Sequence, residues 1–245
     1  MAKLRADQAL VARGLVESRA KAQALIMAGK VFIGERRVEK AGAPIDPEAA
    51  LEVRGQDHPW VGRGGLKLDH ALKHFGLDPT GRTAIDVGSS TGGFTDVLLA
   101  HGAERVFAVD VGKGQLAWRL RTDPRVVVLE GVNARHLTES QIPEPIGAVV
   151  CDASFIGLAT VLPRPLEFAS SGAWLAALIK PQFEAGRGNV GKNGVVRDEA
   201  VRQACVERVV AWLEDAAGWH IAGVTESPIT GAEGNVEFLV AATKP

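Results

Sequence analysis

A glycine-rich turn with an acidic residue at each end is the first place where the sequence indicates chemistry. Residues 86–96 read DVGSSTGGFTD and lie between an expected strand, 84–87, and an expected helix, 94–101. Glycines let backbone N–H groups approach a ligand closely. The turn lacks the G-x-G-x-x-G spacing of dinucleotide sites, because Ser90 occupies the second glycine position, and no Gly-Lys-Ser/Thr follows as in a phosphate loop.

The remaining features favour a cationic nucleoside without phosphates, such as S-adenosylmethionine. Asp86 ends the expected strand, where its carboxylate would face an ammonium group. Asp110 ends the next strand, where a carboxylate can accept hydrogen bonds from both ribose hydroxyls. The segment 130–133 is expected to hydrogen-bond adenine through Glu130 and Asn133. The turn itself adds the candidates Gly88, Ser89, Ser90, Gly92, Gly93 and Phe94.

Charged side chains follow four expected strands, and the fold must bring them together. They are Asp110, Glu130, Asp152 and Lys180, after the segments 105–109, 126–129, 148–151 and 173–179. A long helix over 197–216 and a last strand over 236–241 complete the alternation of strands and helices. This alternation predicts an α/β fold whose doubly wound sheet binds ligands at the carboxyl ends of its strands.

The N-terminal segment differs from the rest in charge. Residues 1–40 carry nine Lys/Arg and four Asp/Glu, whereas the whole chain has a net charge of −1. Asp7 and Ser18 are expected to cap two short helices, and Val31–Ile33 to form a hairpin with Val38 around Gly34-Glu35. A loosely patterned stretch then places a domain boundary between 1–58 and 59–245.

A compact basic helix pair predicts contacts with an RNA phosphate backbone. A solvated charged face is the alternative. The candidate RNA-binding residues are Arg5, Arg19, Lys21, Lys30, Arg36 and, just past the boundary, Arg63. Trp60, beside the same boundary, is expected either to stack on a base or to pack between the domains.

Other classes of protein are disfavoured by composition. Two cysteines, Cys151 and Cys205, do not make a disulfide framework or a Cys-rich zinc site, and the six histidines show no metal-ligand spacing. We therefore expect no metal. The chain shows no secretion signal, and its longest apolar run, 173–179, is far shorter than the ~20 residues of a membrane helix. The expectation is a cytoplasmic protein without a membrane partner, and the sequence leaves its oligomeric state open.

Three motifs together resemble the TlyA family, whose members are known as hemolysin A or as ribosomal RNA 2′-O-methyltransferases. They are DVGSSTGGFTD, the upstream GRGGLKL and the strand end IKPQFE. The resemblance covers nearly the whole chain. It implies an α+β S4-like RNA-binding domain over 1–58 and an FtsJ-like, Rossmann-like class I methyltransferase domain over 59–245, with an antiparallel last strand. Two departures from the family pattern are Gly62 in place of serine and Ile33-Gly34-Glu35 in place of an Asn/Asp-Gly turn.

The resemblance further implies an activity and a partner: methyl transfer from S-adenosylmethionine to the ribose 2′-hydroxyl of a cytidine, in ribosomal RNA or ribosomal subunits. It implies a catalytic Lys-Asp-Lys-Glu tetrad, which by motif match is Lys67, Asp152, Lys180 and Glu237. A lysine acts as a base only when its pKa is lowered, by burial or a nearby ammonium. We expect Lys180 to be the base, Lys67 the nearby ammonium and the two carboxylates to orient them. Asp152 also lies near the expected methyl group.

Around the tetrad, we expect Phe94, Phe155 and Phe183 to form an apolar wall, because the sulfonium loses its charge during transfer. The stretch 183–194 contains three glycines and the basic residues Arg187 and Lys192, which indicates a basic lid. Three alternatives remain: a membrane-active hemolysin, a nonenzymatic RNA-binding protein that only holds S-adenosylmethionine, and a dehydrogenase.

Overall fold

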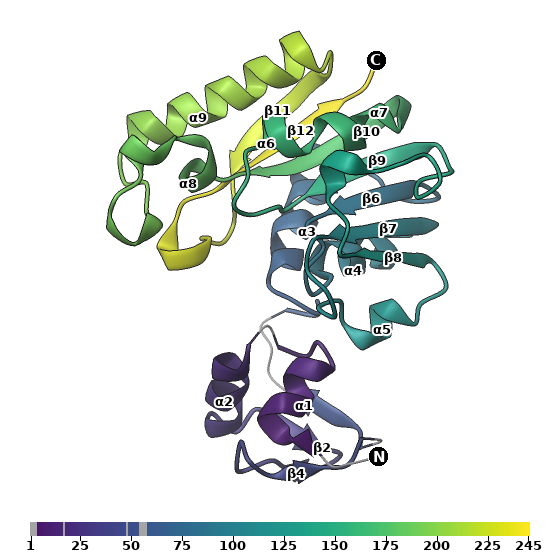
Figure 1. Ribbon diagram of the computed structural model, residues 1–245, viewed down its shortest axis with the longest axis vertical. Coiled ribbons are helices and arrows are strands. Elements are labelled where there is room, and N and C mark those ends of the chain that lie inside the picture. The colour runs from purple at the N-terminus through teal and green to yellow at the C-terminus, as the bar shows by residue number, and fades with distance from the viewer. Residues whose placement is uncertain (1–3, 17, 48, 54–57) are drawn as a thin grey trace.

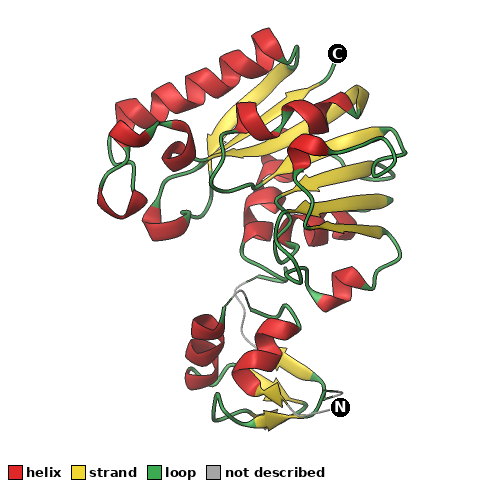
Figure 2. Ribbon diagram, in the orientation of Figure 1, coloured by secondary structure: helices red, strands yellow, loops and turns green. Residues whose placement is uncertain are grey.

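The chain forms a small N-terminal domain connected to a larger α/β domain (Figure 1). The computed structural model describes residues 4–16, 18–47, 49–53 and 58–245. Short helices and strands make up the small domain, whereas the larger one is built around a twisted sheet with helices on both faces (Figure 2). The small domain precedes the larger one along the chain.

The N-terminal domain packs two helices against short strands. Its elements are β1 (Leu4–Arg5), α1 (Ala6–Ala12), α2 (Arg19–Met27), β2 (Val31–Ile33), β3 (Arg36–Arg37), β4 (Pro44–Ile45) and β5 (Leu51–Val53). Its core includes Leu10, Ile26 and Val31. The hairpin of β2 and β3 is confirmed, as is the cap of α2, where the Ser18 hydroxyl accepts a hydrogen bond from the Lys21 N–H.

The expected cap of α1 is wrong. Arg5 occupies the position before this helix, and Asp7 lies inside its first turn, where it is fully buried. The buried position follows from the partners of Asp7, because a buried carboxylate needs hydrogen-bond donors, and two arginines and a glutamine supply them.

The larger domain contains a seven-stranded sheet in the order β11-β12-β10-β9-β6-β7-β8. The strands are β6 (Thr83–Val87), β7 (Arg105–Asp110), β8 (Val126–Glu130), β9 (Ile146–Cys151), β10 (Ala169–Ile179), β11 (His220–Glu226) and β12 (Phe238–Thr243). Six of them run in the same direction, whereas β12 runs antiparallel to its neighbours β10 and β11. The doubly wound sheet with an antiparallel last strand is therefore confirmed.

Apolar residues alternate between two cores, one on each face of this sheet. Ile85 and Val149 contribute to one core, and their neighbours Ala84 and Val150 to the other. The helices are α3 (Gly64–Phe75), α4 (Gly93–Ala100), α5 (Trp118–Arg121), α6 (Leu158–Val161), α7 (Pro163–Glu167), α8 (Pro181–Glu184) and α9 (Glu199–Ala211). Residues of α3 and α4 line the second core, and residues of α6, α7 and α9 the first.

Three details of the C-terminal part differ from the expected pattern. Helix α9 ends at Ala211, and residues Trp212–Ala216 form a wider π-helical turn. Strand β11 was not expected, because it is an edge strand with mostly half-exposed side chains and carries no continuous apolar run. Glu237 lies immediately before β12 rather than inside it, and this shift avoids placing a charge within the central ladder.

Candidate active site

Four elements bring the tetrad residues to one edge of the sheet. Lys67 lies on α3, Asp152 follows β9 and Lys180 follows β10. Because β9 and β10 are parallel, their carboxyl ends meet at the same edge. Glu237 reaches that edge from the opposite direction, since β12 runs antiparallel to β10 and starts where β10 ends. The sheet topology thus explains how residues up to 170 positions apart come together.

The four side chains form a chain of alternating charges. The Lys67 ammonium lies 2.7 Å from Glu237 Oε2 and 3.7 Å from Asp152 Oδ1. The Lys180 ammonium lies 2.8 Å from the same Oδ1, and it donates to the Asp152 carbonyl and to the Ser154 hydroxyl. Lys67, Lys180 and Glu237 are only 6%, 7% and 2% exposed. Charges buried to this extent are costly unless paired, and each has a partner here.

A cavity of about 310 Å³ opens onto the tetrad. All four tetrad residues line it. The other polar and glycine residues of its wall include Arg63, Thr91, Gln182, Gly62, Gly64, Gly88, Gly93 and Gly231. Phe94, Phe155 and Phe183 form its apolar part, and the rings of Phe155 and Phe183 are 5.1 Å apart between centroids. Gly231 closes the wall behind Glu237: a Cβ there would lie 2.0 Å from Oε1, so only glycine fits.

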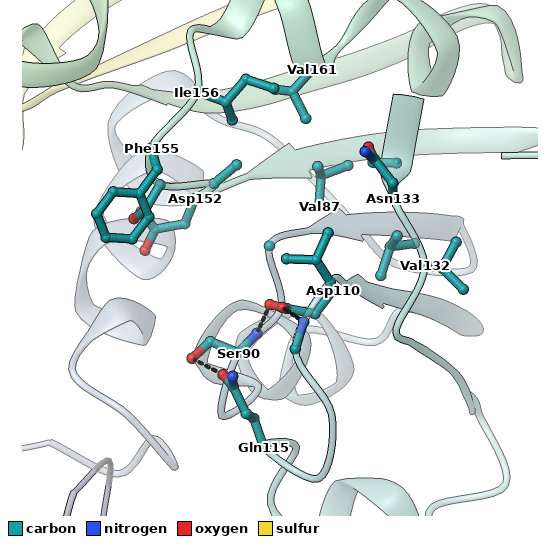
Figure 3. A pocket seen from close by; sticks show the side chains of 17 residues that line it. Val87, Ser90, Asp110, Gln115, Val132, Asn133, Asp152, Phe155, Ile156 and Val161 are labelled. Carbon is teal, nitrogen blue, oxygen red and sulfur yellow. Dashed lines mark hydrogen bonds between the residues drawn. The ribbon is translucent and has the colours of Figure 1, made fainter. Parts of the chain in front are cut away.

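A second cavity, of about 500 Å³, is shown in Figure 3. Asp110 at the end of β7, Asp152 directly after β9 and Asn133 in the loop after β8 line it, together with apolar residues such as Val132 and Ile156. The two cavities share wall residues: Gly88, Ser90, Asp152, Ser154 and Phe155. A ligand in the second cavity would therefore present one end to the tetrad.

Asp110 is hydrogen-bonded both to the glycine-rich turn and to the loop that follows its own strand. Its Oδ2 accepts a hydrogen bond from the Ser90 N–H at 2.8 Å, and its Oδ1 accepts one from the Gly112 N–H at 2.7 Å (Figure 3). Ser90 has a positive φ of 46°. Gly88 has a φ of 81°, and a Cβ at this position would lie 2.8 Å from the Ala153 Cα. The turn is thus fixed both by hydrogen bonds and by close backbone packing.

Two of the expected cofactor-binding acids do not line either cavity. Asp86 is fully buried beneath the turn, where Oδ2 accepts from the N–H and hydroxyl of Thr95 and Oδ1 has no partner within the described structure. Burial raises the pKa of Asp86 to about 7. Glu130 instead accepts N–H groups of the loop 114–116. Burial alone would raise the pKa of Glu130, but Arg121 and these N–H groups lower it to about 2.

The other expected cofactor residues divide between the two cavities, except for one that lines neither. Gly88, Ser90, Asp110, Asn133 and Asp152 line the second cavity, whereas Ser89, Gly93 and Phe94 line only the tetrad cavity. Gly92 lines neither of them and packs against Leu116 and Leu120, with a φ of 96°. Glu130, Gly92 and Asp86 therefore support the walls of the site rather than forming its surface.

Sequence reasoning did not single out three residues that shape the site. Ser154 binds Lys180, and Gln182 donates from Nε2 to Glu237 Oε1 at 3.2 Å. Asn235 is buried and joins two loops: its amide donates to the Gly194 and Ala232 carbonyls and accepts from the Val196 N–H. Gln182 lies in the motif IKPQFE and Asn235 lies two residues before Glu237, so both were close to residues that the resemblance implied.

The basic candidates lie mainly on the N-terminal domain. Lys21 and Arg36 are exposed, Lys30 is half-buried, and Arg5 and Arg19 bind Asp7. Arg63 is exposed and lines the tetrad cavity. From the expected lid, Phe183 lies in the cavity wall and the segments 187–189 and 192–194 form short 3₁₀ turns outside it.

Known protein families match both parts of the chain. A model of the FtsJ-like methyltransferase family matches residues 60–244, and an S4 domain model matches residues 4–51. A Mycobacterium tuberculosis protein named 16S/23S rRNA (cytidine-2′-O)-methyltransferase TlyA is 50% identical over 237 residues, covering 96% of this chain and 88% of that protein. The chain belongs to the TlyA family of FtsJ-like methyltransferases.

Two further proteins match over most of their length. Hemolysin A of Brachyspira hyodysenteriae is 39% identical, covering 96% of this chain and 98% of its own. A solved structure from Streptococcus thermophilus, 41% identical, superposes with a TM-score of 0.77 and covers 100% of this chain and 89% of that one. Over the described residues, no helix is long and apolar enough to cross a membrane, and no group of three or more metal-binding side chains occurs.

Proposed function

We propose that the protein transfers a methyl group from S-adenosylmethionine to the ribose 2′-hydroxyl of a cytidine in ribosomal RNA. The observation that carries this proposal is the position of Lys180, whose buried ammonium is held at Asp152 in the wall shared by two adjoining cavities. The activity named for the Mycobacterium tuberculosis relative supports the choice of ribosomal RNA and of cytidine. Ribosomal RNA or subunits are then the partner, and the cytoplasm the location.

The second cavity fits the proposed cofactor in its chemistry. Asp110 offers carboxylate lone pairs to ribose hydroxyls, Asn133 offers an amide to adenine, and Val132 and Ile156 offer apolar surface to the base. Asp86 is buried beneath the glycine-rich turn and lines neither cavity, so it supports the turn and does not contact the ligand. When bound, S-adenosylmethionine supplies a methyl group on a positively charged sulfonium, and this charge disappears as the methyl group leaves.

The side chains of the tetrad cavity prepare the 2′-hydroxyl for attack. Lys180 accepts the hydroxyl proton at its Nζ once its own ammonium proton has been released, because a hydroxyl is a poor nucleophile while protonated. Ser154 and Asp152 hold that Nζ in place, and Lys67 adds a second positive charge next to Asp152. The phenylalanine wall of the cavity lowers the local polarity, which favours a reaction that removes a charge.

Asp110→Ala is expected to weaken S-adenosylmethionine binding by about tenfold to a hundredfold, the equivalent of losing about 1–3 kcal/mol. The variant leaves the Ser90 and Gly112 N–H groups without their acceptor and removes the ribose contact. Isothermal titration calorimetry measures the change. Asp78→Ala is a matched control, since Asp78 also accepts an N–H two residues on but lies outside both cavities. Equal affinities of Asp110→Ala and wild type would contradict the assignment.

Asp86→Asn is expected to flatten the pH dependence of stability. In the folded protein, burial raises the pKa of Asp86 from 3.8 to about 7, so the native state holds a proton that the unfolded chain releases. This stabilising contribution is complete below about pH 4 and is lost as the pH rises to about 7. The asparagine variant should therefore gain stability relative to wild type across this range, as measured by urea unfolding.

Urea unfolding of wild type and Asp86→Asn at pH 5 and pH 8 brackets this change. Parallel pH profiles for wild type and Asp86→Asn would show that Asp86 does not titrate in this range.

The proposal as a whole is tested by methyl transfer from labelled S-adenosylmethionine. Assembled ribosomal subunits and naked ribosomal RNA are offered separately, and incorporation is counted in each RNA. We expect transfer to at least one of these substrates. Cofactor binding without transfer to any of them would favour a nonenzymatic RNA-binding protein instead. A liposome leakage assay serves as the control for the name hemolysin carried by the Brachyspira hyodysenteriae relative, and we expect no leakage.

A further inference from the structure

One buried carboxylate in the N-terminal domain holds two arginines. Asp7 Oδ1 accepts from Arg5 Nε at 3.0 Å, and Oδ2 accepts from a terminal nitrogen of Arg5 at 3.2 Å and of Arg19 at 3.1 Å. Gln23 donates to the same Oδ2. Arg5 ends β1 and Arg19 begins α2, so Asp7 on α1 ties together side chains from three elements.

The two arginines differ from their acceptor in exposure. The Asp7 side chain is 0% exposed, whereas those of Arg5 and Arg19 are 49% and 55% exposed. The hydrogen bonds of Arg5 and Gln23 hold the pKa of Asp7 well below its usual range, so the carboxylate is ionised in any ordinary buffer. Each guanidinium has five N–H donors, and about half of each arginine side chain is exposed at the surface, where a ligand can reach it.

We infer that Asp7 is a positioning residue that fixes Arg5 and Arg19 for contact with RNA backbone phosphates. The inference rests on the proposed function, which makes RNA the ligand of this domain. An arginine in water must be ordered before it can bind a phosphate, and that ordering reduces affinity. Asp7 orders both guanidinium groups before RNA binds, and it contacts only some of the N–H donors of each group.

Asp7→Asn separates positioning from simple charge, because the two effects have opposite signs. The substitution removes one negative charge beside a polyanion ligand, so electrostatics alone predicts tighter RNA binding. Loss of positioning predicts about tenfold weaker binding, from the added cost of ordering two long side chains. The slope of log affinity against log salt should stay unchanged, since the number of neutralised phosphates is the same.

A matched control exists in the methyltransferase domain. Asp123 holds Arg125 through the same pair of hydrogen bonds and at the same spacing of two residues. Asp123→Asn therefore makes the same change in net charge at a position far from the N-terminal domain in sequence, and we expect it to leave RNA affinity unchanged. Filter binding to ribosomal RNA without cofactor measures both variants. Tighter or unchanged binding by Asp7→Asn would overturn the inference.

Circular dichroism shows whether Asp7→Asn unfolds the domain. If it does, variants of the two arginines test the inference instead. Arg5→Ala, Arg19→Ala and the double variant form a thermodynamic cycle. Arginines held by one carboxylate should act as a unit, so that the double variant loses less affinity than the product of the single losses. Independent, multiplicative losses would contradict positioning through Asp7.

Steady-state kinetics distinguishes this inference from the proposed function. For Asp7→Asn, we expect KM for RNA to rise about tenfold, as for the affinity above, with kcat unchanged. An inactive wild type would refute the proposed function, and the binding experiment would still decide the role of Asp7. An active wild type whose Asp7→Asn variant keeps the same KM would refute only the role of Asp7.

Discussion

Lys180→Ala is expected to lower the rate of methyl transfer to ribosomal RNA by about a thousandfold, within the range that a general base contributes. The substitution removes the group that accepts the 2′-hydroxyl proton and leaves Asp152 with the more distant Lys67. Cofactor affinity should change little, because Lys180 does not line the second cavity. Single-turnover rates at saturating RNA and cofactor measure the effect.

Two further variants separate proton transfer from charge. Lys180→Arg keeps the positive charge but cannot release its proton, so it should be nearly as inactive as the alanine variant. Lys73→Ala removes an exposed lysine of α3 that pairs with Asp69, and it should keep full activity. Substantial activity in Lys180→Arg would indicate an electrostatic role for this position, and activity of Lys180→Ala within tenfold of wild type would remove it from the chemistry.

Glu237→Leu is expected to destabilise the protein by about 3–5 kcal/mol, the usual effect of removing one partner of a buried ion pair. The substitution leaves the buried Lys67 ammonium without its 2.7 Å partner and takes the acceptor from Gln182. Urea unfolding measures the free energy. Methyl transfer should be lost as well, even at a temperature where the variant is fully folded.

The double variant Lys67→Met/Glu237→Leu distinguishes stability from function. Replacing both charges with apolar groups removes the uncompensated charge, so most of the lost stability should return while activity stays absent. A Glu237→Leu protein as stable as wild type would show that the Lys67 charge finds another partner. A double variant that regains activity would contradict a chemical role for the pair.

The alternation of strands and helices was sufficient to predict the sheet and the positions of three charged residues at its strand ends. Asp110, Asp152 and Lys180 lie where their strands end, because a parallel sheet brings carboxyl ends together. Asp86 and Glu130 also end strands, yet neither reaches a cavity. A strand-end acid can face the ligand or bind the loop that follows it, and only the path of that loop decides between these positions.

Other parts of the site depend on long-range contacts that local patterns do not encode. The meeting of Lys67 with Glu237 requires the antiparallel return of β12, which begins at the edge where β10 ends. In the sequence, Asp7 has the residue type and position of a helix cap. In the structure, its ion pairs with Arg5 and Arg19 hold it in a buried position inside α1. In both cases tertiary pairing of a buried charge overrides the local preference.

The central claim, methyl transfer to a ribose hydroxyl with Lys180 as base, is tested most directly by identifying the modified nucleoside. Ribosomal RNA treated with wild type or with Lys180→Ala is digested completely. Its nucleosides are separated and then identified by mass spectrometry. We expect 2′-O-methylcytidine from the wild-type reaction and none from the variant. A methyl group on a base, or the same ribose-methylated nucleoside from both reactions, would contradict the claim.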